Sequence, residues 1–368
     1  MPVLIILIVV GLLLGVQGVI YRKYWGHKLT AQVDFQDHFM LEGNETVITE
    51  VMTNDKMLPL PWVHLKFQIK RNGKSVNIFR SDVFNILFHQ RITRTSSIRL
   101  EHRGIYQISK LDLLSYDLFI TKKFVKAEDN KAEILIYPKG MEQDEIIVPY
   151  EKIMGDVATK RYTMEDPFLF KGIREYGPQD NFKSINFKAS AKAGKWLVNT
   201  HEYTLDQTVR VLLLTDRGTD YFVENVYEAG LRLAVGLISQ LERDGIPASL
   251  YSNGLDSLDQ QEVNLQAGCS ESHIESVLAA LARIDLTVTG TAGDEVIRSL
   301  LEKYEPEDYY VIICPDYSNR MLSAYEELRE YTTSCVYLAP ISKLGANEED
   351  DVIQQIEKRV EGFFFHQV

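Results

Sequence analysis

Residues 174–192 read REYGPQDNFKSINFKASAK and separate two parts of the chain that have different sequence patterns. Before them, short segments alternate apolar and polar residues, as strands do; after them, strand-like runs alternate with helical patterns. Within the stretch, Gly177-Pro178 predicts a turn and Asp180 predicts an N-cap. Residues 181–193 predict a helix of about three turns that ends at Gly194. The stretch is therefore expected to be a capped helix that joins two domains.

The same stretch carries a dense set of charged side chains, which gives it a second interpretation. Such a set can form a surface that recognises a protein partner, rather than a linker alone. The side chains predicted to bind the partner are those of Arg174, Tyr176, Asp180, Lys188 and Lys192.

The N-terminal segment 1–25 is predicted to be a transmembrane anchor. Val3 to Ile20 contains no charged residue, and at about 1.5 Å per residue this run comes close to the thickness of a bilayer core. A cleaved signal peptide is the alternative, but the basic residues Arg22 and Lys23 follow the apolar run instead of preceding it. The positive-inside rule then predicts a single-pass protein of the cell membrane whose soluble domains are cytoplasmic.

Residues 26–138 are predicted to form an all-β domain. Thr46–Val51 and Val63–Ile69 alternate with period two, and turn signals separate such segments at short intervals. This pattern favours an immunoglobulin-like sandwich. Residues 139–205 are expected to be a connector that contains the 174–192 stretch, with a strand-like run at Ile146–Val148.

Residues 206–368 are predicted to form a doubly wound α/β domain. Val209–Thr215 is a nearly continuous apolar strand, as expected where helices cover both faces of a sheet. Helical patterns follow at Val223–Arg243 and Ser270–Ile284, and Asp351–Phe364 is expected to be a closing helix. Repeated strand–helix units predict a mainly parallel sheet, and such sheets bind ligands at the carboxyl ends of their strands.

Taken together, these motifs resemble the domain of unknown function 58 family, in which a membrane anchor and a β-sandwich accompany a von Willebrand factor A-like domain. The residues that carry the resemblance are Arg174, Tyr176, Pro178, Asp180, the run Ile185–Lys192 and the aliphatic strand that ends at Asp216. The chain departs from the family where Phe187 replaces tryptophan and Lys192 replaces arginine. The second change keeps the charge and loses the planar guanidinium.

The resemblance also implies a cation site at the strand ends. In the family, the loop after the first strand carries an aspartate and two serines that hold a divalent ion. Here the aspartate is kept as Asp216. Gly218 replaces the first serine and offers no side-chain oxygen, and Asp220 replaces the second. Ser270 and Asp316 fall near the other expected ligand positions. If this degenerate set of Asp216, Asp220, Ser270 and Asp316 holds an ion, its hard oxygen donors favour Mg²⁺. The alternative is an aspartate that caps a helix or organises a turn.

Cys269 and His273 form a second candidate pair, because their spacing places both on one face at a helix start. No third group is identifiable to orient them, so a core thiol and a surface histidine are the simpler interpretation. The three cysteines, an odd number, fit a reducing compartment, and the formal net charge of −12 argues against binding to nucleic acid. No phosphate-binding loop or serine-hydrolase elbow occurs in the sequence.

No catalytic set stands out, so the chain is expected to be a membrane-anchored, cytoplasm-facing interaction or scaffold protein rather than an enzyme. The resemblance implies a MoxR-type AAA+ ATPase and a transglutaminase-like membrane protein as partners. A metal-dependent hydrolase that uses the Asp216 and Asp316 region is the alternative. An extracytoplasmic adhesion module would require the opposite topology.

Overall fold

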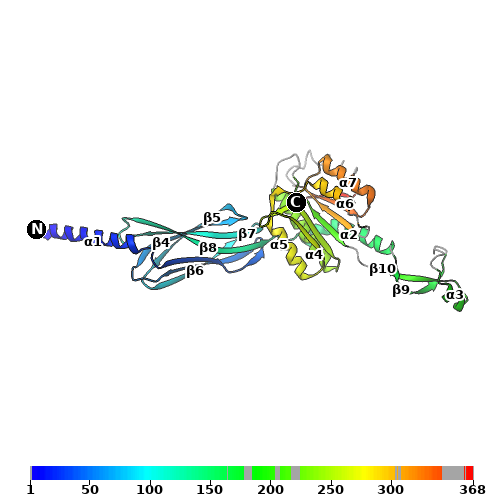
Figure 1. Ribbon diagram of the computed structural model, residues 1–368, viewed down its shortest axis with the longest axis horizontal. Helices are drawn as coiled ribbons and strands as arrows, with labels where there is room; N and C mark the ends of the chain where they lie inside the picture. The colour runs from blue at the N-terminus through cyan, green and yellow to red at the C-terminus, as the bar shows by residue number, and fades with distance from the viewer. Residues whose placement is uncertain are drawn as a thin grey trace. The chain divides into compact units, whose positions relative to one another are not determined.

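The computed structural model describes residues 2–163, 165–177, 185–203, 208–216, 224–302, 305, 308–341, 360 and 362–367. The chain forms two compact units. The first contains residues 1–139 with two short pieces, 256–259 and 278–285, and the second contains the rest. The two units are described separately below, and Figure 1 shows the elements of each.

The chain begins with helix α1 (Pro2–Tyr24), which confirms the predicted apolar helix. Within the described residues, Val3–Tyr24 is the one helix long and apolar enough to cross a membrane, and its side chains are almost entirely exposed. A signal sequence passes the same test of length and composition, so the membrane anchor stays a prediction. The last turn differs from the rest, because the Tyr21 side chain is buried and its hydroxyl donates to the Pro59 carbonyl at 2.6 Å.

Two sheets follow α1, one of three strands in the order β1-β3-β6 and one of five in the order β2-β8-β7-β4-β5. Both sheets contribute to one hydrophobic core, for example Ile48 and Met52 from the first and Leu65 and Leu113 from the second. The strands are β1 (Leu29–Phe35), β2 (Phe39–Leu41), β3 (Glu45–Asn54), β4 (Leu60–Arg71), β5 (Lys74–Ile86), β6 (Gln90–Arg99), β7 (Gly104–Tyr116) and β8 (Lys123–Tyr137). The predicted β-rich body is confirmed, and it is built as two layers over a shared core.

The second unit is organised around a mixed sheet in the order β13-β12-β11-β15-β16-β17, with β14 paired to β12. The pairs between β12, β11, β15, β16 and β17 are parallel, and β13 is antiparallel to β12. The strands are β11 (Val209–Leu213), β12 (Ala248–Asp256), β13 (Glu262–Gly268), β14 (Ile284–Thr289), β15 (Tyr309–Ile313), β16 (Cys335–Ile341) and β17 (Phe363–Gln367).

Helices cover both faces of this sheet. Alternate residues of β11 and β15, such as Leu212 and Ile312, share a core with helices α6 (Gly293–Glu302) and α7 (Asn319–Tyr331). The residues between them face α4 (Glu224–Arg243), where a Cβ on Gly230 would lie 3.5 Å from Ile313 and 3.7 Å from Leu213. The alternation of buried strand residues between two helical layers explains why these strands are apolar except at Arg210 of β11.

Three predicted elements differ from the structure. Ile146–Val148 lies in helix α2 (Gln143–Thr163) instead of a strand, because a short apolar run does not distinguish the two. Phe363 and Phe364, expected at the end of a helix, begin strand β17, which extends the parallel sheet. The expected helix over 181–193 is the shorter α3 (Phe187–Ala193), which follows a bridge between Ile185 and Val198.

Candidate functional site

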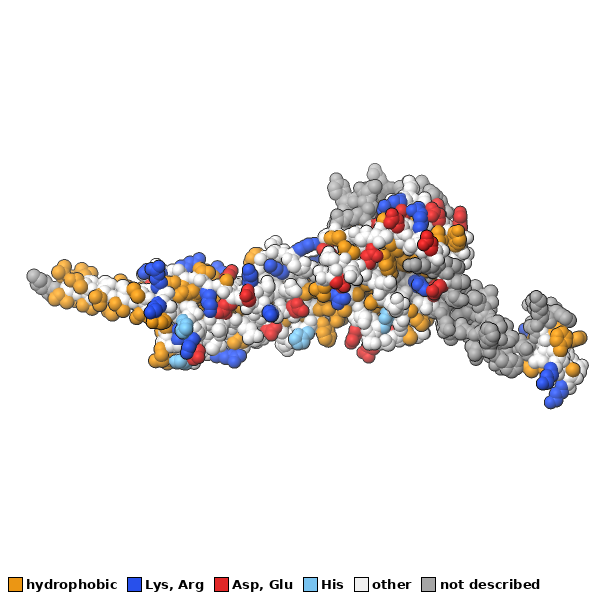
Figure 2. All heavy atoms as spheres, in the orientation of Figure 1, with side chains coloured by type: hydrophobic (Ala, Val, Ile, Leu, Met, Phe, Trp, Pro, Cys, Tyr) orange, Lys and Arg blue, Asp and Glu red, His pale blue; other side chains and the backbone are white. Residues whose placement is uncertain are grey.

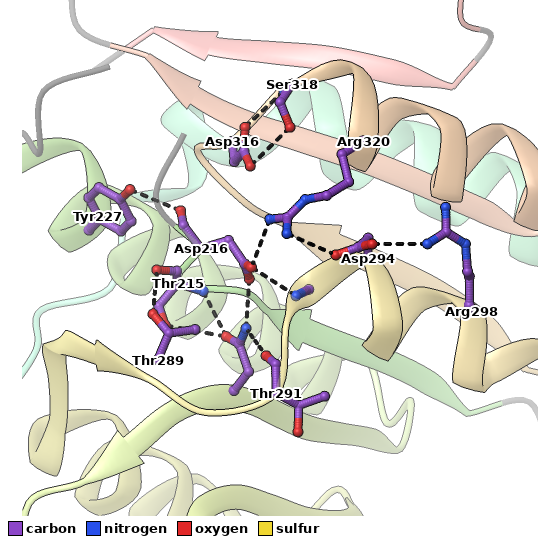
Figure 3. Close-up of polar contacts among 12 residues, drawn as sticks. Thr215, Asp216, Tyr227, Thr289, Thr291, Asp294, Arg298, Asp316, Ser318 and Arg320 are labelled. Carbon is purple, nitrogen blue, oxygen red and sulfur yellow. Dashed lines mark hydrogen bonds and ion pairs between the residues drawn. The ribbon is translucent and has the colours of Figure 1, made fainter. Parts of the chain in front are cut away.

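The candidate site of the α/β unit lies at the carboxyl ends of two neighbouring strands. Asp216 follows β11 by three residues and Asp316 follows β15 by three residues. Since β11 and β15 are parallel and Leu213 is in register with Ile313, both aspartates reach the same edge of the sheet (Figure 3). Both residues are almost fully buried. The parallel topology therefore brings together the two aspartates that the sequence placed at one sheet end.

The Asp216 carboxylate is held by two N–H donors. The Gly293 backbone N–H donates to Oδ1 at 2.8 Å and the Asn253 side-chain amide donates to Oδ2 at 2.6 Å. A Cβ on Gly293 would lie 2.4 Å from Oδ2, so only glycine allows the backbone to come this close. The Tyr227 hydroxyl donates to the Asp216 carbonyl at 2.9 Å, which also fixes the backbone. Asp216 is therefore a well-ordered acceptor.

Asn253, which follows the parallel part of β12, links three segments of the site. Its Oδ1 accepts from the Thr215 backbone N–H at 2.8 Å, and its amide donates to the Thr291 carbonyl at 2.9 Å as well as to Asp216. Asn253 itself is fully buried. A buried amide that is satisfied on both sides fixes the loops after β11 and β14 in one arrangement.

An arginine lies between two carboxylates at the rim of the site. Arg320 Nη2 is 3.6 Å from Asp216 Oδ1, and its Nη1 is 3.4 Å from Asp294 Oδ1 (Figure 3). Asp294 also accepts from Arg298 Nη1 at 2.9 Å. About half of the Arg320 side chain remains exposed. The rim is therefore a partly solvated network of two arginines and two aspartates.

Asp316 organises the turn between β15 and α7. Its Oδ1 accepts from the Ser318 backbone N–H at 2.8 Å and its Oδ2 accepts from the Ser318 hydroxyl at 3.2 Å. The Tyr337 hydroxyl donates to the Asp316 carbonyl. Burial, followed by the charge of Asp216, raises the pKa of the neighbouring Cys314 thiol, so this thiol stays neutral. These contacts match the alternative in which an aspartate caps a turn.

The predicted Mg²⁺ ligand set does not come together as proposed. Ser270 follows β13 at the edge where Gly268 is in register with Ala248, the first residue of β12, so it lies at the opposite end of the strands from Asp216. Its hydroxyl pairs with Ser272 at the start of α5 (Glu271–Arg283). Asp220 lies outside the described residues. In the described part of the chain, no group of three His, Cys, Asp or Glu residues is placed to hold a metal ion.

The donor set also does not fit a bound divalent cation. The carboxylate oxygens of Asp216 and Asp316 face N–H and O–H donors, and a guanidinium already lies between Asp216 and Asp294. A cation placed there would compete with the positive charge of Arg320. The geometry thus describes an internal ion-pair site.

The residues predicted to bind a partner lie on a small hairpin with its own helix. β9 (Glu165–Glu175) pairs with β10 (Leu197–Tyr203), and α3 lies between them in sequence. Arg174 and Tyr176 lie at the end of β9, whereas Lys188 and Lys192 lie on α3, all four with exposed side chains. Asp180 lies outside the described residues. The N-cap of α3 is Asn186, whose side chain accepts from the Ala189 N–H, and Gly194 takes the predicted left-handed C-cap.

Two aromatic rings add to this group. Phe187 and Trp196 are more than half exposed and meet edge to face with ring centroids 6.3 Å apart. Lys195 pairs with Glu175 across the hairpin. The hairpin therefore presents aromatic and basic side chains to solvent. Trp196, directly before β10, is a member of this surface that the sequence analysis does not single out.

Five residues of the strand-end site are not singled out by the sequence analysis. They are Asn253, Thr291, Gly293, Asp294 and Arg320. The run Gly290-Thr291-Ala292-Gly293-Asp294, a glycine-rich turn with an acidic residue at a helix start, is the signal that could have indicated this loop.

Cys269 and His273 show no hydrogen bond to each other in the described residues. Cys269 is exposed, and the His273 backbone N–H donates to Ser270 as part of the helix start. A Cβ on Gly268 would lie 2.8 Å from the His273 ring, so the ring packs against the chain. The simpler interpretation, a core thiol and a surface histidine, is therefore wrong in its placement, because the thiol is exposed and the histidine ring is half-buried.

Comparison with known proteins finds no matching family model and no matching curated protein. Solved structures with local similarity include the CARDB domain of the PF1109 protein from Pyrococcus furiosus, with 13% identity over 29% of this chain and 93% of that one, at a TM-score of 0.20. The C-terminal domain of wzt has 8% identity over 31% and 75% of the two chains, at a TM-score of 0.25. BslA, a bacterial hydrophobin, has 13% sequence identity over 31% of this chain and 97% of its own, at a TM-score of 0.20. Similarity at this level carries no information on function.

Proposed function

We propose that this chain is a membrane-anchored, cytoplasm-facing protein that binds a protein partner through its second unit. In this proposal the sandwich is immunoglobulin-like and the α/β unit is von Willebrand factor A-like, as the sequence resemblance implies. Two layers over one core, antiparallel except for the parallel pair β2–β8, support the first assignment. Helices on both faces of a mainly parallel sheet, with acidic residues at its strand ends, support the second.

The anchor is supported by the way in which α1 is built into the fold. Tyr21 belongs to the sandwich core, and Trp25 stacks on Phe124 with ring centroids 5.6 Å apart. Cleavage after the apolar run would remove a buried core side chain or leave it on a frayed end. An uncleaved helix keeps these contacts. The free thiols and the basic residues Arg22 and Lys23 after the helix support a cytoplasmic orientation.

The observation that carries the partner-binding proposal is the exposed aromatic and basic surface of the hairpin. Phe187, Trp196 and Tyr176 expose ring surface, and Lys188 and Lys192 flank it. Aromatic residues with adjacent charges are enriched at protein interfaces, where a ring fills a pocket and the charges form a polar rim. This composition suits a partner surface with an apolar pocket and acidic borders.

The resemblance suggests which partner to test first. We propose a MoxR-type AAA+ ATPase, with a transglutaminase-like membrane protein as a further component of the complex. The metal-dependent hydrolase gains no support from the described residues, because the carboxylates at the strand ends already face hydrogen-bond donors and Arg320.

The test is binding of the purified ATPase to the full-length chain in lipid nanodiscs, measured by biolayer interferometry. Trp196→Ala and Phe187→Ala each remove an exposed ring and are expected to weaken binding at least about tenfold, the effect of losing an aromatic hot spot of more than 1.4 kcal/mol. Tyr331→Ala is the matched control, because Tyr331 is an equally exposed aromatic residue on α7. Equal affinities for all variants would contradict the hairpin as the binding surface.

A further inference from the structure

The end of the sandwich that carries α1 is formed by three loops. The loop of residues 55–59 contacts the α1 junction, where Tyr21 donates to Pro59 and the Asp55 N–H donates to the Lys28 carbonyl at 3.0 Å. It also meets the loop of residues 87–89, because the His89 N–H donates to the Lys56 carbonyl at 3.2 Å. The third loop, residues 117–122, joins β7 and β8. Figure 1 shows α1 leaving this end of the sandwich.

These three loops expose apolar side chains at their tips. Loop tips of soluble domains are usually polar, whereas here one to three large apolar residues in each loop are between 47% and 75% exposed. The residues are Met57, Leu87, Phe88, Leu118, Phe119 and Ile120. Apolar residues gathered at one end of a domain indicate a surface that is covered by something else.

The loop of residues 117–122 holds its apolar residues outward by a defined set of hydrogen bonds. The buried Asp117 carboxylate accepts from the Thr121 N–H at 2.6 Å, from the Lys122 N–H at 3.2 Å and from the Gln17 side chain of α1 at 3.0 Å. Ile120 has φ of 57°, a left-handed conformation that is rare for a β-branched residue. The chain therefore maintains an unfavourable backbone in order to keep this loop in shape, which is typical of functional positions.

The loop lies at the same level as exposed apolar residues of α1. Gln17 contacts Asp117, and a Cβ on Gly18 would lie 3.3 Å from the Lys122 ammonium. Val19 and Ile20, which follow in the same helix, are still exposed. A bilayer that covers Val19 and Ile20 consequently reaches the level of the Leu118–Ile120 tip as well.

Basic residues surround this apolar end, as lipid headgroups require. Arg22, Lys23, Lys28, Lys122 and Lys123 are all exposed. Figure 2 shows the hydrophobic side chains along α1 and basic side chains where the helix meets the sandwich. Lysine and arginine side chains at a membrane boundary can place their charges among the phosphates while their stems cover apolar surface.

A groove beside α1 adds a specific contact point. It has a volume of about 330 Å³ and is lined by Ile20, Tyr24, His27, Lys56, Met57 and Leu58. The Lys56 ammonium is buried and has no hydrogen-bond partner in the described part of the chain. Burial, followed by the charge of Lys126, lowers the pKa of Lys56 to about 8. An anionic headgroup in the groove would satisfy this ammonium and favour its charged form.

We propose that the α1 end of the sandwich is seated in the lipid bilayer, with the tips of the 55–59, 87–89 and 117–122 loops inserted at the interface around the anchor and Lys56 facing an anionic headgroup. The domain then lies directly on the membrane without a spacer. This proposal rests on the proposed function only in that α1 is the anchor; it does not depend on the partner.

The experiment is a depth measurement on the full-length chain in vesicles. Cys269→Ser removes the exposed thiol, and Phe119→Cys introduces one at the loop tip for labelling with the fluorophore NBD. Cys314 and Cys335 are buried and remain unlabelled. The matched control is Ser75→Cys, because Ser75 is exposed at the start of β5, at the opposite end of the sandwich. Vesicle flotation is measured on the same samples.

Seating predicts a blue-shifted emission at position 119 and loss of most of its fluorescence with lipids that carry a shallow nitroxide quencher, while the label at position 75 stays unquenched. If the protein floats with the vesicles and the label at position 119 is as unquenched as that at position 75, seating is overturned and the anchor stands. Failure to float would overturn the anchor and the seating together.

The role of Lys56 is tested with Lys56→Gln. In the wild type, quenching at position 119 is expected to be stronger in phosphatidylglycerol vesicles than in phosphatidylcholine vesicles, and the substitution is expected to remove this difference. An unchanged difference would overturn the role of Lys56.

Discussion

Strands β3 and β15 show two ways in which this chain buries a strand. In β3, every second residue from Thr46 to Asn54 is buried and the residues between are only half-buried, because the sheet has one covered face. In β15, all five residues are buried, because helices cover both faces. Strand β15 therefore carries no charged residue, and Asp316 lies beyond its end, whereas the sandwich strand β3 carries polar residues along its length.

Truncating one apolar side chain in each of these two environments is expected to give the largest difference in stability. Ile312→Ala removes a fully buried side chain between the β15 neighbours and α7 and is expected to lower the free energy of unfolding of the α/β unit by about 2–5 kcal/mol. Val125→Ala, on an exposed position of β8, is expected to change stability by no more than about 0.5 kcal/mol. Urea unfolding of the full-length protein in detergent micelles measures both. Similar losses for the two variants would contradict the one-sided burial of the sandwich strands.

A buried carboxyl in β3 gives the second prediction. Glu50 is buried on the same face as Ile48 and Met52, and neither of its side-chain oxygens has a hydrogen-bond partner in the described residues. Burial, with a smaller contribution from the charge of Asp82, raises the pKa of Glu50 from 4.5 to about 7. The folded state therefore binds a proton that the unfolded state releases between these values, and stability falls as pH rises through that window.

Glu50→Gln is expected to remove this slope and to stabilise the sandwich above pH 7 by at most about 3 kcal/mol, with little effect at pH 4.5 and below. Thermal unfolding at pH 4.5, 6 and 8 measures the effect. Glu45→Gln, on an exposed position of the same strand, is the control. The prediction is contradicted if the wild-type melting temperature rises between pH 5 and 8 and matches that of Glu50→Gln at each pH. The Glu50 carboxyl would then ionise without lowering the stability of the folded state.

The smallest expected effect concerns the rim of the strand-end site. Arg320→Gln removes a guanidinium that is half exposed, so stability should change by no more than about 1 kcal/mol. In calorimetry, wild-type protein is expected to show no saturable Mg²⁺ binding, because Arg320 holds the position between Asp216 and Asp294. Saturable binding to the wild type that Asp216→Ala abolishes would instead revive the metal-dependent hydrolase.

Much of the fold follows from sequence patterns whose physical cause is simple. The alternation of β3 and the nearly continuous apolar strand β11 reflect burial on one side and on two sides, and the apolar run Val3–Ile20 lies within the single helix α1. The misassigned Ile146–Val148 run shows the limit, because three apolar residues fit a helix face as well as a strand. The sequence pattern places Phe363 and Phe364 at the end of a helix, and only their pairing with β16 identifies them as the start of a strand.

The candidate site was less predictable. Asp216 and Asp316 could be placed at one edge because parallel strands end together. Ser270 could not, because it follows an antiparallel edge strand, which runs in the reverse direction and ends at the opposite edge. Arg320 and Asn253 reach Asp216 from elements distant in sequence, and their side-chain contacts depend on tertiary packing that no local pattern encodes.

Tyr21 links helix α1 mechanically to the sandwich. Its ring lies in the sandwich core and its hydroxyl holds the 55–59 loop, so no slack segment separates the apolar helix from the folded domain. A force on the helix would reach the core through this ring within one turn of helix. With α1 in a membrane, as proposed, tension or tilt of the helix would be transmitted to the hydrogen-bonded strands of the sandwich. A chain shortened to begin after the helix would lose a buried side chain of the sandwich core.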